Sequence, residues 1–183
     1  HVALVGERKS GRRSGAVPAS NRGLMTMLTR IEVQEEDFSV AKEYELLSAN
    51  SASGAVVTFS GLVRNTPDGQ LKGLELEHYP GMTEKALDAI VKEASQRWPL
   101  QGVTVIHRVG YLPVNEQIVF VGVASGHRQQ AFDAASFIMD YPKTQAPFWK
   151  KEYTQAGEQW VEAKTSDQQA ADQWRNSDTG SQE

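Results

Sequence analysis

The amino-acid sequence predicts an α+β fold, in which helices pack against a mostly antiparallel β-sheet. Short apolar or alternating runs, which are typical of strands, are separated by segments whose apolar residues recur about every 3.6 positions, as in amphipathic helices. Turn-forming residues join some of the strand-like runs directly, which favours antiparallel neighbours. With 183 residues, of which 39% are hydrophobic, the chain has enough apolar side chains for the core of a single soluble domain.

Seven runs of residues are expected to form β-strands. In chain order they are residues 31–33, 55–63, 73–79, 103–109, 117–124, 148–153 and 159–163. The run 117–124 is apolar almost throughout, which indicates a central strand covered on both faces. Residues 65–69 (NTPDG) supply turn chemistry between the second and third runs, and Gly157 lies between the last two. A hairpin is therefore predicted at each of these two places.

The first two predicted helices have clear start and stop signals. Ser39 can accept hydrogen bonds from the free N–H groups at the start of a short helix. A longer helix is expected at about residues 83–98, with Glu84 in its first turn and Pro99 after its end. The faces that these helices are expected to bury consist of Val40, Tyr44 and Leu47 in the first helix, and of Leu87, Ile90, Val91, Ala94 and Trp98 in the second.

A third helix is expected to begin after Ser125 or Gly126, either of which can cap it, and to end near Pro142. The face that it is expected to bury consists of Ala131, Phe132, Ala135, Ile138 and Met139. A last short helix is predicted over residues 166–174, because Ser166 and Gln169 have the spacing of a capping box.

The two ends of the chain are expected to lie outside the domain. Residues 1–24 are rich in Gly and Ser and basic, and they have no apolar segment of the kind found in a secretory signal, so an unstructured leader or a remnant of cloning is expected there. One domain is predicted over residues 25–175, followed by a polar tail at 176–183.

Charge and composition exclude several classes of protein. Residues 1–24 carry five Lys or Arg side chains and one acid, yet the whole chain has a net charge of −4, so the rest of the chain is acidic. This disfavours general nucleic-acid binding, which needs a cationic surface. No run of residues approaches the ~18 apolar positions of a membrane span. With 0 Cys the chain has no disulfide, thiolate metal site or cysteine nucleophile, and the reducing cytoplasm is the expected location.

Cations are the most promising functional residues. His127 and Arg128 lie at a predicted helix start, where free N–H groups and the helix dipole favour an anion such as phosphate. Arg64 follows an apolar strand and can reach into a cleft. Each of these groups also has a simpler interpretation as a solvated surface charge.

Lysines near a predicted strand form the other candidate group. Lys143, Lys150 and Lys151 can act as acids, bases or nucleophiles if burial or neighbouring cations lower their pKa. On a strand, Lys150 and Glu152 point to one face and Lys151 to the other, so only one face can serve a given site. Solvated lysines remain the simpler alternative.

Other catalytic patterns are missing from the sequence. The four histidines have no short metal-ligand spacing, and His107 is expected to be a hydrogen-bonded core residue. The glycines fit no phosphate-binding or nucleotide-binding fingerprint, so no metal and no cofactor are predicted. The residues alone therefore indicate an α+β domain with a cationic patch suited to an anion.

Eight ordered motifs nevertheless resemble a known family, the catalytic (large) subunits of molybdopterin synthase. They are AVVTFSGLVRN at 55–65, LEHYPGMTE at 76–84, RWP at 97–99, VIHRVG at 105–110, VFVGV at 119–123, GHR at 126–128, FIMDY at 137–141 and PFWKKE at 147–152. The resemblance extends over about residues 31–174 in uninterrupted order.

The resemblance implies a fold, a reaction and a set of partners. The fold would be an α/β hammerhead with an additional antiparallel β subdomain. The enzyme would be a sulfurtransferase of molybdenum cofactor biosynthesis that converts cyclic pyranopterin monophosphate to molybdopterin. The sulfur would come from the C-terminal Gly-Gly thiocarboxylate of a small ubiquitin-like carrier subunit. Two large subunits would form a homodimer within a heterotetramer. A chain with 0 Cys fits this scheme, because a partner holds the sulfur.

Carried over motif by motif, the resemblance also implies a site. Lys143 and Lys150 would be catalytic. The substrate-binding residues would be Leu62, Val63, Arg64, Lys143, Lys150, Lys151 and Glu152, with His127 and Arg128 contributed across the dimer. The sequence departs from the family pattern at Pro142 and at Gln145, and Pro142 would re-aim Lys143. The alternative is a non-catalytic module that keeps the fold and binds a pterin phosphate or the carrier.

Overall fold

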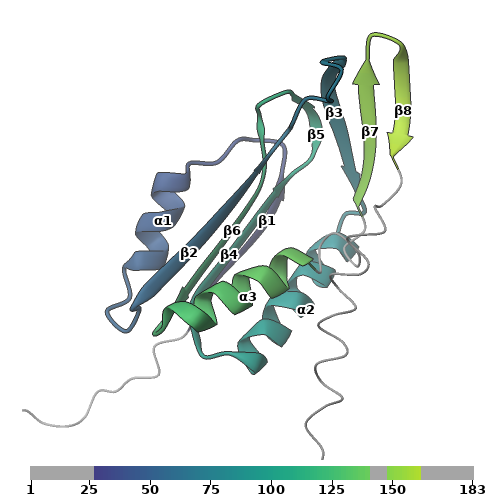
Figure 1. Cartoon of the computed structure of the whole chain (residues 1–183). Helices are drawn as coiled ribbons and strands as arrows, with labels where there is room; N and C mark the ends of the chain where they lie inside the picture. The colour runs from purple at the N-terminus through teal and green to yellow at the C-terminus, as the bar shows by residue number, and fades with distance from the viewer. Residues whose placement is uncertain (1–26, 141–147, 162–183) are drawn as a thin grey trace, which may run out of the picture.

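Two four-stranded β-sheets make up the body of the protein (Figure 1). The computed structural model describes residues 27–140 and 148–161, and within these residues it contains three helices and eight strands. The predicted α+β class with an additional antiparallel unit is confirmed.

The first sheet has the strand order β1-β4-β6-β2. Its strands are β1 (Leu28–Gln34), β4 (Leu100–Arg108), β6 (Gln117–Ser125) and β2 (Ala55–Leu62). β1 runs parallel to β4, whereas β4 with β6 and β6 with β2 are antiparallel. The central position predicted for the apolar strand 117–124 is confirmed, because β6 lies between β4 and β2 and is largely buried.

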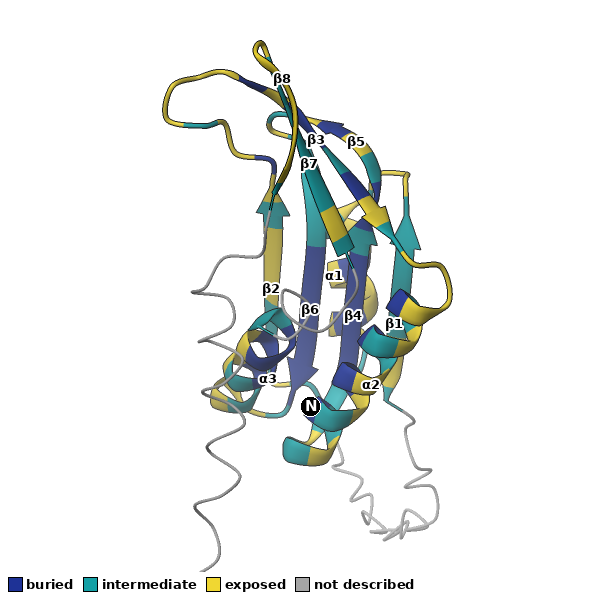
Figure 2. Cartoon of the chain, turned by 90° about the vertical axis from the view of Figure 1, so that its right-hand side faces the viewer, coloured by how far each residue is buried: buried dark blue, intermediate teal, exposed yellow. Residues whose placement is uncertain are grey.

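Helices cover both faces of the first sheet, as Figures 1 and 2 show. Helix α1 (Val40–Ser48) lies on one face, where Leu47 packs with Phe120 and Ile106. Helices α2 (Met82–Arg97) and α3 (Arg128–Asp140) lie on the other face, above the main apolar core. Two separate apolar clusters therefore hold the helices to the sheet.

The second sheet is antiparallel throughout and has the strand order β5-β3-β7-β8. Its strands are β5 (Gly110–Pro113), β3 (Leu71–His78), β7 (Phe148–Thr154) and β8 (Gly157–Val161). A third buried cluster holds it to the end of β2 and consists of Val63, Leu71, Leu74, Leu76 and Leu112. The β7–β8 hairpin predicted around Gly157 is confirmed, and Gly157 has a φ of 126°, which favours glycine.

The hairpin predicted for residues 55–79 is wrong. Residues 65–69 do turn, with the Gly69 N–H donating to the Thr66 carbonyl, but β2 pairs with β6 and β3 pairs with β5 and β7. The chain passes from one sheet to the other at Val63, whose backbone bonds to Asn115 and Glu116. Burial of the β3 leucines against distant parts of the chain therefore outweighs the hairpin that the local turn chemistry had favoured. The short strand β5 was not among the seven predicted strands.

Two of the predicted helix faces need correction. Tyr44 is 48% exposed on α1, while Glu43 is buried in an ion pair with Arg30 at 3.2 Å. Phe132 is 57% exposed on α3, while Phe137 is fully buried and packs edge-on against Trp98. In α3 the buried arc is turned toward α2 as well as toward the sheet, so Phe132 lies outside it.

The remaining helix predictions agree with the structure where it describes them. Ser39 caps α1 by accepting the N–H of Lys42, and the helix predicted at 83–98 is α2. Helix α3 begins at Arg128, and the His127 carbonyl accepts the N–H of Ala131, so the start lies slightly later than predicted. The leader, the helix at 166–174 and the tail lie outside the described residues. Within the described ranges no helix is long and apolar enough to cross a lipid bilayer.

Candidate functional site at the junction of the two sheets

Lys150 and Glu152 lie on the inward face of β7. They stand opposite Leu76 and Leu74 of β3, and residues paired across a sheet point to the same face. Both leucines are buried in the cluster that contains Val63. Lys150 and Glu152 are each partly buried, and they therefore flank the apolar cluster that joins the second sheet to the end of β2.

Lys151 lies on the opposite, outward face of β7, as the alternation of a strand predicts. Its ammonium group is 3.0 Å from the Glu158 carboxylate and lies 4.9 Å from the centre of the Trp160 ring. The hydrogen bond to Glu158 raises the pKa of Lys151 above its ordinary value, against a smaller opposite effect of burial. Lys151 thus stays a cation at neutral pH, and the structure separates it from Lys150. Its predicted contact with the substrate stays a prediction.

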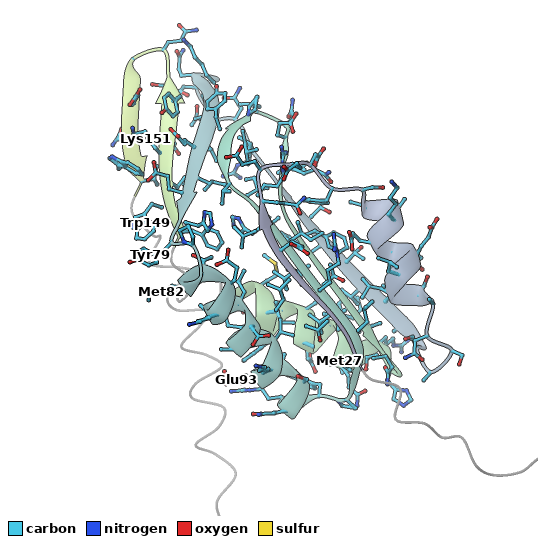
Figure 3. All side chains as sticks on the ribbon, turned by 180° about the vertical axis from the view of Figure 1, so that it is seen from behind. Met27, Tyr79, Met82, Glu93, Trp149 and Lys151 are labelled. Atoms are coloured by element: carbon cyan, nitrogen blue, oxygen red, sulfur yellow. The ribbon has the colours of Figure 1, made fainter. Side chains whose placement is uncertain are left out.

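The outward face of the second sheet is rich in aromatic residues. Figure 3 shows Lys151 and Trp149 on β7 with Tyr79 and Met82 near the base of the sheet. Trp149 is 48% exposed, and Tyr153 donates a hydrogen bond to Glu75 that raises the pKa of the Tyr153 hydroxyl. This face offers protonated groups and aromatic rings, and it is distinct from the face that carries Lys150.

A stacked pair of rings fixes the start of β7. The ring of Phe148 lies parallel to the imidazole of His107 on β4, with centroids 3.8 Å apart and an interplanar angle of 19°. The His107 Nδ1 lies 2.8 Å from the Arg108 carbonyl, so Nδ1 carries the proton and donates it. Burial, with a smaller effect of nearby His78, lowers the pKa of His107 to about 4, against the hydrogen bond to Arg108, which raises it. The hydrogen bond predicted for His107 is confirmed, whereas the side chain is partly buried and not a full core residue.

The functional consequence of this stack was not predicted. Phe148 is two residues before Lys150, so a neutral His107 on the first sheet helps to set where Lys150 stands. The two rings are 41 positions apart in the chain, and no local pattern in the sequence links them.

Leu62, Val63 and Arg64 lie where β2 ends and the chain turns to the second sheet. Leu62 is 54% exposed, whereas Val63 is 1% exposed and anchors the turn. Arg64 is exposed, and among the described residues it has neither a hydrogen bond nor an ion pair. Its guanidinium group is free to bind an anion beside the cluster that Lys150 flanks.

His127 and Arg128 are exposed at the far end of the first sheet. They follow Ser125, which pairs with Ala55 at the start of β2, whereas Leu62 is at the end of β2. The eight residues of β2 extend over roughly 26 Å at ~3.3 Å per residue. Within one protomer the structure thus brings Leu62, Val63, Arg64, Lys150 and Glu152 to one junction and leaves His127 and Arg128 at the other end. Lys143 lies outside the described residues.

A pair of glycines holds the backbone next to His127. A Cβ atom built on Gly54 would overlap the carbonyl oxygen of Gly126, whereas a Cβ on Gly126 would meet its nearest atom, the Ala52 carbonyl oxygen, at an ordinary 3.8 Å. We expect Gly54→Ala to lower the free energy of unfolding by ~1–3 kcal/mol, because backbone must move. Gly126→Ala is the matched control and is expected to stay within ~0.5 kcal/mol of the parent. Urea unfolding measures both, and equal midpoints would contradict the close approach.

Comparisons of the sequence and of the fold with known proteins give consistent matches. The family model described as MoaE protein matches residues 33–145. A relative from Salmonella typhimurium, named molybdopterin synthase catalytic subunit, is 61% identical over 147 residues, which are 80% of this chain and 98% of the relative. The solved structure of the molybdopterin biosynthesis MoaE protein from Burkholderia ambifaria has a TM-score of 0.70 and 46% identity, over 81% of this chain and 99% of that chain. A crystal structure of molybdopterin synthase from Staphylococcus aureus has a TM-score of 0.67 and 33% identity, over 72% of this chain and 96% of that chain.

The fold, the cations at the junction of its two sheets and these relatives together indicate one class of protein. This class is the catalytic subunit of an enzyme that builds a cofactor. The chain belongs to the MoaE protein family. The resemblance found in its sequence motifs is thereby confirmed.

Proposed function

We propose that the chain converts cyclic pyranopterin monophosphate to molybdopterin, with sulfur supplied by the C-terminal thiocarboxylate of a small ubiquitin-like carrier subunit. Membership in the MoaE family supports the reaction class. The observation that carries the proposal is the placement of Arg64 and Lys150 at one junction in a chain with 0 Cys. Both the cyclic phosphate and the thiocarboxylate are anions, and neither a thiol nor a metal thiolate of this chain is available to deliver sulfur.

The proposed chemistry uses the carrier as the nucleophile. The thiocarboxylate sulfur attacks a carbon of the precursor that carries oxygen, so that a C–S bond forms while the bond from that carbon to oxygen breaks, and nearby cations stabilise the negative charge that develops on the departing oxygen until it is protonated. Lys150, with Lys143 as its predicted partner, supplies the proton. Water then cleaves the bond between the acyl carbon and sulfur, which leaves the sulfur on the pterin and returns the carrier as a carboxylate. Two carriers are consumed for the two sulfurs of one product.

The residues around Lys150 favour its role as a proton donor. Lys150 is partly buried beside Leu76, and Val161 of β8 stands opposite it on the other side, so apolar residues limit its contact with water. Glu152 on the same face can orient Lys150 or a bound water. Phe148, held by His107, limits the movement of the strand. Electrostatic interactions are stronger in such partly desolvated surroundings than in water.

The partners that follow from this proposal are the carrier, the cyclic phosphate substrate and a second copy of the chain within a heterotetramer. The cytoplasmic location predicted from the sequence stays a prediction, as do the substrate contacts of Leu62, Val63, Lys151 and Glu152.

A reconstituted assay tests the proposal. The purified chain, the cyclic precursor and a carrier ending in a thiocarboxylate are expected to yield the dithiolene product at two carriers per product. A carrier that ends in an ordinary carboxylate is the matched control and is expected to yield none. Product formed without a thiocarboxylate would contradict a sulfur held by the partner. Tight binding of precursor and carrier without turnover would instead favour the non-catalytic binding module.

A further inference from the structure

Two successive residues end strand β4, close to where the first sheet meets the second (Figure 1). They are His107 and Arg108, and β5 of the second sheet begins two residues later. Because side chains alternate along a strand, His107 lies on the face that α2 and α3 cover, and Arg108 lies on the face of α1. His107 holds Phe148 and thereby the strand that carries Lys150. Arg108 points the other way and holds a different part of the chain.

Arg108 is a buried cation that binds two separate segments. It is 8% exposed. Its Nε and Nη2 donate to the carbonyl oxygen of Glu35, at 3.0 and 2.9 Å, in the segment between β1 and α1. Its Nη1 donates to the carboxylate of Glu116 at 2.9 Å and to the carbonyl oxygen of Gln117 at 3.0 Å. The planar guanidinium group therefore fixes the turn before β6 to the segment after β1.

The same turn holds the backbone of Val63. The Val63 N–H donates to the carbonyl oxygen of Glu116 at 2.9 Å, and the Val63 carbonyl oxygen accepts the N–H of Asn115 at 2.8 Å. Val63 is 1% exposed and packs in the apolar cluster at the sheet junction. The next residue is Arg64, whose side chain is exposed. The place of Arg64 therefore depends on Val63, on the turn and, through the turn, on Arg108.

Stability alone is a poor reason for a buried arginine at this place. The carboxylates of Glu116 and Asp37 lie 2.9 and 3.7 Å from its Nη1. Apolar side chains, such as Ile106 and Phe120 on the same face of the sheet, often stabilise a fold at least as well as a buried ion pair does. Four donated hydrogen bonds to two segments supply something that apolar packing does not, namely a fixed direction of the turn.

We propose that Arg108 is a positioning residue of the candidate site, which fixes through Glu116 and Val63 where the guanidinium group of Arg64 meets the substrate anion. The structural link from Arg108 to Arg64 stands on the contacts described above. The assignment of the anion as the phosphate of the precursor rests on the proposed function.

The position of Arg108 next to His107 gives the proposal a further consequence. His107 sets the strand of Lys150, and Arg108 sets the turn that leads to Arg64. Two successive residues of one strand thus determine the spacing between a group that binds the anion and a group that supplies a proton. Catalysis is sensitive to such spacing, because a misplacement of ~1 Å by a distant substitution can cost ~10²-fold in rate.

The first experiment measures the order at position 64 and needs no turnover. Because the chain has 0 Cys, Arg64→Cys introduces a single thiol for a nitroxide spin label. Glu116→Ala removes a partner of Arg108 from the turn. The central line of the label's EPR spectrum is then expected to become narrower, because the label moves faster when Val63 is held less tightly. A label at Lys85→Cys, which is exposed on α2, is expected to keep its spectrum.

Glu35→Ala is the matched control for Glu116→Ala. Arg108 binds the backbone carbonyl of Glu35, which this substitution keeps, so the spectrum at position 64 is expected to stay the same. An unchanged spectrum at position 64 in Glu116→Ala, or equal narrowing at positions 64 and 85, would overturn the proposal. Arg108→Lys keeps the charge but loses the planar fork, and it is expected to narrow the line at position 64 as well. If Arg108→Lys does not fold, Glu116→Ala alone decides.

The second experiment measures turnover with thiocarboxylated carrier at varied concentrations of the cyclic precursor. Glu116→Ala is expected to raise KM for the precursor by ~3–10-fold and to leave kcat within about two-fold, because a displaced Arg64 weakens binding while the proton donor stays in place. In the Arg64→Ala background the same substitution is expected to raise KM no further, since it acts through Arg64.

Two results of the kinetic experiment would contradict the role of Arg108. One is an increase in KM that persists in the Arg64→Ala background, and the other is a loss in kcat with KM unchanged. A protein without turnover would still give the expected EPR spectra and would count against the proposed function alone.

Discussion

Replacing Lys150 by alanine is expected to lower turnover with thiocarboxylated carrier by ~10²-fold or more, the usual loss when a positioned acid or base is removed. The side chain lies on the inward face of β7 beside the cluster that ends β2, so its loss removes a cation and a proton donor from the junction. Lys150→Arg keeps the charge but cannot readily exchange a proton, and it is expected to restore little activity. Single-turnover product formation is the measurement.

Two other lysines make this test specific. Lys72→Ala removes an exposed lysine from β3 in the same sheet and is expected to leave turnover near that of the parent. Lys151→Ala is expected to cost less than Lys150→Ala, because Lys151 faces outward and pairs with Glu158. Equal losses for Lys150→Ala and Lys151→Ala would contradict the separation of the two faces. Near-normal product from Lys150→Ala would remove this lysine from the chemistry.

Acidification from pH 6.5 to pH 4 is expected to destabilise the parent through His107 by up to about 3 kcal/mol. In the unfolded chain this histidine takes up a proton near pH 6.5, whereas in the folded chain burial delays protonation to about pH 4. The contribution of neutral His107 to the free energy of unfolding is therefore complete above pH 6.5. It declines as the pH falls toward 4 and changes no further below that pH. His107→Asn keeps a donor toward the Arg108 carbonyl but does not titrate in this range.

Urea unfolding of the parent and of His107→Asn between pH 7.5 and pH 4 measures this effect. The free energy of unfolding is expected to fall more steeply with decreasing pH in the parent than in the variant, since the carboxylates titrate equally in both. The difference is expected to vanish above pH 7. Parallel curves throughout would show that His107 is not kept neutral under Phe148.

Local patterns predicted the elements well and the pairing of strands less well. The 3.6-residue period and Pro99 located α2 to within about one residue, because a helix forms from neighbours in sequence. The hairpin at 55–79 was wrong, because the partner of β2 is β6, more than fifty positions later, and burial of leucines in another sheet outweighed a local turn. Phe132 was misplaced for a similar reason, since α2 takes part in deciding which arc of α3 is buried.

In the candidate site, too, the local features could be predicted from the sequence and the long-range ones could not. Strand alternation alone predicted that Lys150 and Lys151 would point to opposite faces, which the structure confirms. It could not predict that Arg64 would lie beside the cluster flanked by Lys150, or that His127 and Arg128 would lie at the other end of β2. These relations depend on how two sheets meet, which is a property of tertiary packing. The stack of His107 on Phe148 belongs to the same class.

The second sheet has a consequence for how the protein acquires its activity. Its strands come from three separate excursions of the chain, at 71–78, 110–113 and 148–161, each of which leaves from the segments that build the first sheet and its helices. No single cut of the polypeptide can release the second sheet as a domain, although it looks like one in Figure 1. Contacts so distant in sequence are slow to form, because the intervening loops must close first. Lys150 gains its neighbours on β3 only when a loop of more than seventy residues has closed, so we expect catalytic competence to depend on this long-range contact and not on the local β7–β8 hairpin.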